Sequence, residues 1–247
     1  MLVRPLAAGP GRALAPVPAP AAGDHSRRNG LPVARLAALW VDVERTPVLR
    51  DLYLTLRPGE AVGVLGGNGS GKTTLLEVLA TLRQPRAGTA RVLGADVSGP
   101  ARFGVRPGIV LVGHTPAAFP ALSLRENLAF LARLTGTPAA AAEAALAAVG
   151  LTGAADRTAD RCSLGMLRRL DLARVLVTRP RLLLLDEPFA GLDPQAAGLV
   201  GALVADTVSR GGGAVVVSHE PDRLAAAVHR TLVLAAGGLA PYAGPTG

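Results

Sequence analysis

Residues 66–73 read GGNGSGKT, a glycine-rich run that ends in a lysine and a threonine. It fits the pattern G-x-x-x-x-G-K-[ST] at every fixed position. The apolar run AVGVL at 61–65 precedes it and is typical of a buried parallel strand, while apolar residues at helical spacing follow over 75–79. The sequence therefore predicts a strand, a glycine loop and a helix in this order.

The glycine loop has the composition of a site for phosphate groups. Glycines let backbone N–H groups wrap closely around phosphate oxygens, and the N-terminus of the following helix adds a partial positive charge. Lys72 is the single lysine of a chain that holds 26 lysines and arginines together. Its compact ammonium fits a hole that a broad, forked guanidinium does not. We expect phosphate binding from the whole run Gly66, Gly67, Asn68, Gly69, Ser70, Gly71, Lys72 and Thr73.

An acidic pair follows a second apolar run. Residues 182–185 are four leucines, as expected of a strand covered on both faces, and Asp186 stands at its carboxyl end, where doubly wound sheets bind ligands. An acidic residue there can hold the Mg²⁺ that the hydroxyl of Thr73 also touches. Glu187 comes next and is placed to polarise an attacking water. The two stretches together predict a site for a nucleoside triphosphate and Mg²⁺.

A third apolar run ends in another polar pair. Residues 214–217 read AVVV, and Ser218 and His219 follow, so His219 is expected to hydrogen-bond the γ-phosphate or the attacking water. Apolar runs of this kind predict an α/β core with strands at 61–65, 109–112, 182–185, 214–217 and 231–235.

The composition sets the outer limits. The chain has 247 residues, a net charge of +8 and one cysteine, Cys162, so an internal disulfide is excluded and a reducing compartment is favoured. No apolar run approaches the roughly 18 residues that a spanning helix needs. Residues 1–30, rich in Pro, Gly and Ala, are expected to be a disordered extension. Aromatic residues make up only 3% of the chain, so nucleic acid is not expected as a partner.

From about residue 34 to 240 the chain resembles the ATP-binding subunits of ABC transporters. Six stretches lie in that family's order. They are the phosphate loop, the region around His114, the signature CSLGM at 162–166, the strand ending in Asp186 and Glu187, the stretch AGLD at 190–193, and His219. The signature is the specific one, because other phosphate-loop families have no counterpart there. The resemblance implies a P-loop NTPase with a RecA-like core and a helical signature subdomain at about 116–175.

The resemblance also implies an assembly. In this family the signature Ser and Gly of one subunit cap the γ-phosphate bound in the other, which assigns that role to Ser163 and Gly165. Thr74 and Asp193 take nucleotide-binding positions by the same comparison. The implied activity is ATP hydrolysis with Mg²⁺ by a homodimer. A chain without a spanning segment then needs a separate membrane permease, reached from the cytoplasmic face through the helical insert and the region of His114.

His114 stands where most members carry Gln, and is assigned to the catalytic set with Glu187 and His219. This His and the Gly-Met at 165–166 look most like the haem-exporter branch, the ATPases of cytochrome c maturation. An ATPase of a drug or polysaccharide exporter is an alternative, and a non-transport ABC ATPase is a second one. A GTPase is excluded, since its N-K-x-D motif needs a second lysine. A small-molecule kinase would not need the signature.

Three departures from the family pattern stand out. Leu164 replaces the usual first signature Gly, and Met166 the usual Gln. Val43 stands where members often carry an aromatic that stacks on adenine. Trp40 lies three residues earlier, on the opposite strand face by parity, and is expected to pack in the core.

Overall fold

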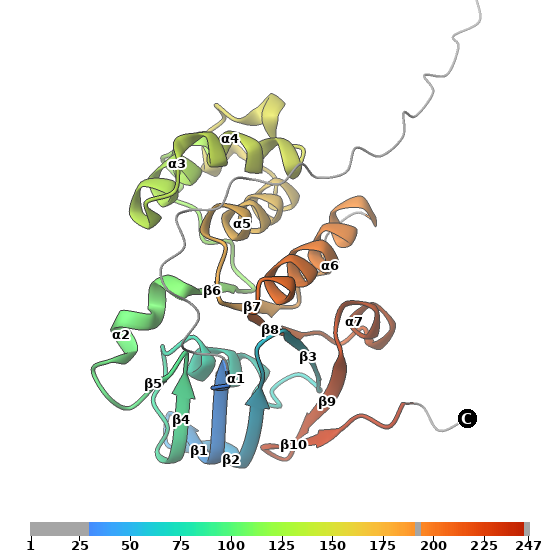
Figure 1. Ribbon diagram of the computed structural model, residues 1–247. Helices are drawn as coiled ribbons and strands as arrows, with labels where there is room; N and C mark the ends of the chain where they lie inside the picture. The colour runs from blue at the N-terminus through green and yellow to red at the C-terminus, as the bar shows by residue number, and fades with distance from the viewer. Residues whose placement is uncertain (1–29, 191–193, 245–247) are drawn as a thin grey trace, which may run out of the picture.

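The computed structural model describes residues 30–190 and 194–244, and Figure 1 shows its layers. Residues 1–29 of the expected extension, and Asp193, lie outside the described residues. In Figure 1 a group of helices lies at the top, a parallel sheet in the middle and an antiparallel sheet at the bottom. The α-helices are α1 (Lys72–Leu79), α2 (Arg102–Val105), α3 (Leu124–Thr135), α4 (Ala139–Ala148), α5 (Leu164–Thr178), α6 (Pro194–Ser209) and α7 (Pro221–Ala227).

The middle sheet has the order β10-β9-β3-β8-β7-β6, with β10 antiparallel to β9 and the other five strands parallel. The parallel strands confirm the five predicted ones within a residue at either end. They are β3 (Glu60–Leu65), β6 (Ile109–Val112), β7 (Leu182–Asp186), β8 (Gly213–Val217) and β9 (Arg230–Ala235), and β10 (Gly238–Pro241) closes the edge.

Each central strand is apolar throughout because both of its faces are covered. Leu182 and Leu184 of β7 belong to a core shared with α1 and the antiparallel sheet, whereas Leu183 and Leu185 belong to a core shared with α5 and α6. All four leucines are fully buried. The run of leucines therefore indicates a strand that is covered on both faces, as the sequence predicted.

The lower sheet has the order β2-β1-β4-β5 and is antiparallel. Its strands are β1 (Ala34–Val43), β2 (Thr46–Leu56), β4 (Ala87–Val92) and β5 (Ala95–Asp96). The pairing of β1 with β2 shifts register three times, and Ala38 in β1 and Asp51 in β2 have φ of 46°. Such bulges bend and twist the strands, so strict alternation of side chains is lost along this pair.

Helices α3, α4 and α5 pack on one another at the top of the molecule. Ser123 caps α3 in a reciprocal arrangement, because its side chain accepts from the Glu126 amide while Glu126 accepts from the Ser123 amide. No helix between residues 30 and 190 or 194 and 244 is long and apolar enough to cross a membrane.

Candidate active site

The phosphate loop joins the end of β3 to the start of α1. Lys72 is the first residue of α1, is only 9% exposed, and donates from Nζ to the carbonyl oxygens of Gly66 at 2.7 Å and Gly67 at 2.9 Å. The ammonium therefore lies across the loop that was predicted to bind phosphate. Thr74, in the same first turn, is also buried.

Two glycines of the loop are required by close packing. A Cβ on Gly66 would lie 2.6 Å from Ser70 Oγ and 2.8 Å from the Leu234 carbonyl oxygen. Gly71 has φ of 102°, and a Cβ there would lie 2.9 Å from the side chains of Val48 and Leu49 in β2. Larger residues at either position would displace the loop from its place between the two sheets.

Other features of the loop suit an anion. A Cβ on Gly67 or Gly69 would meet no protein atom within 4 Å, so the loop has open space beside these two backbones. Helix α1 has no side-chain cap and no acidic residue in its first turn, which leaves its N–H groups for an oxyanion. Ser70 Oγ is buried and has no hydrogen-bond partner within the described residues. These observations fit the phosphate groups of a nucleotide.

Thr73 and Asp186 meet although they stand 113 positions apart. The Thr73 hydroxyl donates to Asp186 Oδ2 at 3.1 Å. Burial raises the pKa of Asp186, the bond from Thr73 opposes this, and the neighbouring charge of Glu187 raises it further. A hydroxyl and a carboxylate are oxygen ligands of the kind that Mg²⁺ prefers. The pair therefore fits the predicted metal position.

Glu187 and His219 also lie together, at the ends of β7 and β8. His219 Nδ1 is 2.8 Å from Glu187 Oε2, and the His219 amide donates to the same oxygen at 3.3 Å. Because an ionised carboxylate only accepts, the contact assigns the hydrogen to Nδ1. No described residue bonds Oε1 of Glu187, which leaves that oxygen available to a water. Glu187 has φ of 48°, an uncommon conformation that is often found at functional sites.

His114 follows β6, and its side chain is exposed. Its charge acts on Asp186, where it lowers the pKa against the effect of burial. The backbone carbonyls of Gly113 and His114 accept hydrogen bonds from Arg168 of α5, at 2.7 Å for Gly113. The structure therefore places the predicted His114 on the same side of the sheet as Asp186.

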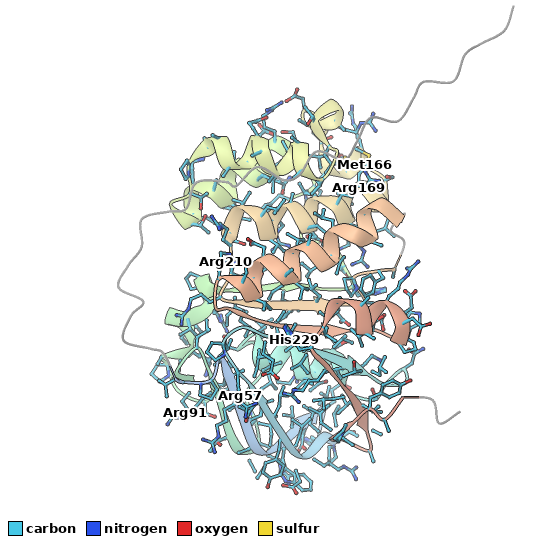
Figure 2. All side chains as sticks on the ribbon, turned by 45° about the vertical axis from the view of Figure 1, so that its right-hand side comes forward. Arg57, Arg91, Met166, Arg169, Arg210 and His229 are labelled. Atoms are coloured by element: carbon cyan, nitrogen blue, oxygen red, sulfur yellow. The ribbon has the colours of Figure 1, made fainter. Side chains whose placement is uncertain are left out.

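The signature residues lie elsewhere in the chain's own fold. Ser163 caps α5 and accepts from the Met166 amide at 3.3 Å, and the Leu164 side chain is 61% exposed. Among the described residues, no hydrogen bond joins Ser163 or Gly165 to the phosphate loop. Figure 2 labels Met166 among the upper helices, well away from His229, which directly precedes β9 of the parallel sheet.

Trp40 and Val43 are the two residues that concern the adenine position of the family pattern. Trp40 is not a core residue, which corrects the prediction that it packs in the core. It is only partly buried, and the Arg86 guanidinium lies 6.0 Å from the ring centroid. The burial pattern shows why, because the neighbours Leu39 and Val41 take the two core positions. Val43 is partly buried at the end of β1, and Asp193 lies outside the described residues.

Arg168 and Asp171 were missed by the sequence analysis. Both are buried, and both contact the segment that follows β6. The available signal was two charged residues three positions apart within a helix, a spacing that places them on one face. The sequence could not say which segment faces them.

Comparison with known proteins gives consistent results. A family model described as ABC transporter matches residues 49–190. The cytochrome c biogenesis ATP-binding export protein CcmA of Bordetella parapertussis is 43% identical over 191 residues, which cover 75% of this chain and 83% of that protein. The doxorubicin resistance ATP-binding protein DrrA of Mycobacterium tuberculosis is 42% identical over 162 residues, or 64% of this chain and 48% of that protein.

A solved structure described as an ATP binding subunit of an ABC transporter superposes with a TM-score of 0.77 and covers 85% of this chain and 90% of that one. Its sequence identity is 24%, so this likeness bears on the fold alone. It agrees with the α/β core and helical part described above.

Proposed function

The chain belongs to the ABC transporter family and is an ATPase, and we propose that its ATP hydrolysis powers an exporter of the cytochrome c biogenesis type. The contact between Thr73 and Asp186 carries the proposal for the site, because it joins the phosphate loop to the acidic strand end at 3.1 Å. Mg²⁺, when bound to these oxygens, would neutralise charge on the phosphate groups.

The residues of the loop bind and orient the nucleotide. Lys72 exchanges its two carbonyl contacts for oxygens of the β- and γ-phosphates, and the open N–H groups of α1 bind the same anion. Gly67 and Gly69 leave room for this approach. The binding set thus comprises Gly66, Gly67, Asn68, Gly69, Ser70, Gly71, Lys72, Thr73 and Thr74.

Glu187 accepts a proton from the attacking water through Oε1. His219 orients the carboxylate by its bond from Nδ1 to Oε2, and its own Nε2 stays available to a phosphate oxygen. His114 acts from the end of the neighbouring parallel strand β6, at the same edge of the sheet as Asp186, in the position where most family members carry Gln. Each of the three side chains therefore has a distinct part in orienting the water and the γ-phosphate.

A second copy of the chain completes the site. Ser163 and Gly165 lie at the start of α5, and within the described parts of one chain they make no hydrogen bond to the loop. A partner copy can present the Ser163 hydroxyl and the open α5 N-terminus to the γ-phosphate. The exposed Leu164 would then lie between the two copies.

A membrane permease is the second partner. Phe119 and Phe130 pack edge to face with ring centroids 5.4 Å apart, yet remain 54% and 38% exposed, and Leu134 beside them on α3 is 68% exposed. Asn127 fixes the Phe119 backbone by bonds at 2.8 and 3.2 Å, so this apolar surface is rigid. Its position next to the segment of His114 suits a cytoplasmic segment of the permease, with the chain at the inner membrane face.

The test of the ATPase site is Glu187→Gln. The amide keeps the size of the side chain but cannot accept the proton, so we expect ATP binding to persist while turnover falls at least roughly 100-fold. Bound, unhydrolysed ATP should hold two copies together, because it stabilises the closed form. Size-exclusion chromatography with Mg²⁺ and ATP should show a dimer, and a variant that hydrolyses ATP like wild type would contradict the role of Glu187.

The test of the cargo is complementation. In a bacterium that lacks its own cytochrome c biogenesis ATPase, the chain should restore c-type cytochromes when expressed with its own permease genes, and Lys72→Arg should not. A drug exporter remains the second candidate, because the doxorubicin resistance protein is 42% identical over 162 residues. Drug resistance without cytochrome assembly would favour the drug exporter.

The permease surface is tested in the same complementation assay. The double variant Phe119→Ser with Phe130→Ser should lose complementation but keep ATP hydrolysis.

A further inference from the structure

Helix α5 is bonded directly to the segment that carries His114. Arg168, in the second turn of α5, donates from Nη1 to the Gly113 carbonyl at 2.7 Å and from Nη2 to the His114 carbonyl. One turn later, Asp171 Oδ1 accepts from the Ala117 amide at 3.2 Å. Two charged side chains of one helix face thus bond the backbone at both ends of residues 113–117.

The contact is buried and carries charge. Arg168 is 7% exposed and Asp171 is 1% exposed. Burial raises the pKa of Asp171, and the bond from Arg174 at 2.7 Å opposes this. Charged groups at this depth cost free energy unless they are bonded, so a role in packing alone would be filled more cheaply by apolar residues.

The contact is also incompletely satisfied. Arg168 Nε and Asp171 Oδ2 are buried without a hydrogen-bond partner in the part of the chain that the structure describes. Unpartnered atoms of this kind raise the free energy of the observed arrangement. Burial of these atoms is therefore not explained by packing alone.

The two ends of this connection are functional residues in the proposed function, on which the inference rests. Ser163 caps the start of α5, five positions before Arg168, and His114 follows β6, which pairs in parallel with the strand that ends in Asp186. A helix moves as a rigid body over such a distance, so a displacement at Ser163 reaches Arg168. The backbone of His114 follows because Arg168 bonds its carbonyl.

We propose that Arg168 and Asp171 are positioning residues that transmit the position of the signature end of α5 to His114. Engagement of Ser163 with the nucleotide on a partner copy then sets where the His114 side chain stands relative to Asp186 and the attacking water. Hydrolysis is thereby tied to the closed arrangement of two copies. Neither residue touches the nucleotide.

The experiment is a double-mutant cycle in ATP turnover. Arg168→Gln removes the forked contact, and His114→Ala removes the side chain that it positions. If Arg168 acts through His114, Arg168→Gln lowers kcat about tenfold in wild type and less than about twofold in the His114→Ala background. KM for ATP of the Arg168→Gln variant stays within about twofold of wild type, because Arg168 does not bind the nucleotide. Asp171→Asn should behave like Arg168→Gln.

Arg230→Gln is the control, because Arg230, like Arg168, donates to a backbone carbonyl, and its bonds to Thr55 and to the Glu60 carboxylate lie far from residues 113–117. It should lower the unfolding temperature comparably and leave kcat unchanged. Arg168→Lys keeps the charge and one donor, so it should retain an intermediate kcat and serves if Arg168→Gln does not fold. Effects of Arg168→Gln and His114→Ala that simply multiply, or a wild-type kcat for Arg168→Gln and Arg168→Lys, would overturn the inference. A wild-type chain without ATP turnover would instead overturn the proposed function.

Discussion

Lys72 is held by two carbonyl oxygens of its own loop, and this contact explains why an arginine cannot replace it. The hole between the Gly66 and Gly67 carbonyls accepts a single nitrogen at 2.7 and 2.9 Å. A guanidinium would place a planar fork there and push the loop outward. We expect Lys72→Arg to lower ATP turnover roughly 100-fold and to weaken nucleotide binding. Turnover assays and titration with a fluorescent nucleotide measure the two effects.

A charge-conserving substitution outside the phosphate loop distinguishes the effect of side-chain shape at Lys72 from the effect of its charge. Arg83→Lys alters a partly buried ion pair between Glu77 of α1 and Arg83, which follows α1, and it should leave turnover unchanged. Near-normal turnover in Lys72→Arg would mean that charge alone suffices and that the narrow fit of the loop is unimportant.

Single residues of the site divide into those that local sequence reveals and those that it does not. Lys72 and Asp186 stand in fixed relation to a strand end, so pattern and spacing locate them. Arg168 and Asp171 act on residues more than 50 positions away, and only the packing of α5 against the segment after β6 shows their partners. Trp40 was misjudged because an aromatic side chain next to two core positions still faces outward.

Among the helices, α3 begins at a reciprocal cap that Ser123 and Glu126 form. Ser123 and Glu126 satisfy each other's amides at 2.8 and 3.1 Å. We expect Ser123→Ala to lower the free energy of unfolding by about 1 kcal/mol, because an amide at the start of α3 loses its acceptor. Urea denaturation measures the change. Ser209→Ala, at the exposed end of α6, is the control and should change stability by less than about 0.5 kcal/mol. Equal effects would contradict the cap.

The elements of the parallel sheet could be predicted, and those of the antiparallel sheet could not. A strand buried on both faces is apolar throughout, and this signal survives in β7 and β8. Strands β1 and β2 carry bulges at Ala38 and Asp51. The bulges interrupt the alternation of side chains from which the two strands would be predicted.

Across the layers of the molecule, Arg230 links the two sheets: its ion-pair partner Glu60 lies in the same parallel sheet, and its hydrogen bond to Thr55 reaches β2 of the antiparallel sheet. Arg230 at the start of β9 donates to Glu60 Oε1 at 2.7 Å and to the Thr55 carbonyl of β2 at 2.8 Å, and the Arg57 amide donates to Glu60 Oε2 at 2.7 Å. Burial raises the pKa of Glu60, but the bonds from Arg230 and Arg57 outweigh it, so the pKa is lowered overall. Protonation of Glu60 therefore loosens the contact between the sheets.

Because the pKa of Glu60 is lowered in the folded protein, the free energy of unfolding depends on pH with a known sign. The stabilisation is fully present above the ordinary glutamate pKa of about 4.3 and is lost as the pH falls through the lower value in the folded protein. We expect Glu60→Gln to cost about 1–2 kcal/mol near pH 7 and progressively less below about pH 4. Chemical denaturation across this range measures both chains.

Asp206→Asn is the matched control, since the exposed Asp206 of α6 pairs with Arg210, just beyond the end of that helix and labelled in Figure 2. It should change stability by less than about 1 kcal/mol at neutral pH. A cost of Glu60→Gln that stays constant down to pH 3 would show that the contact does not depend on the charge of Glu60.

The bends in β2 have a consequence for the chain in crowded solution. Strand β2 is an edge strand of eleven residues, long enough to pair with the edge of another molecule and begin a growing stack. The left-handed Asp51 and the register shifts break its row of free amides and carbonyls, and the Arg50 amide is already taken by Gly237 at 2.9 Å. A straightened β2 would make the protein prone to aggregate at the concentrations reached during expression.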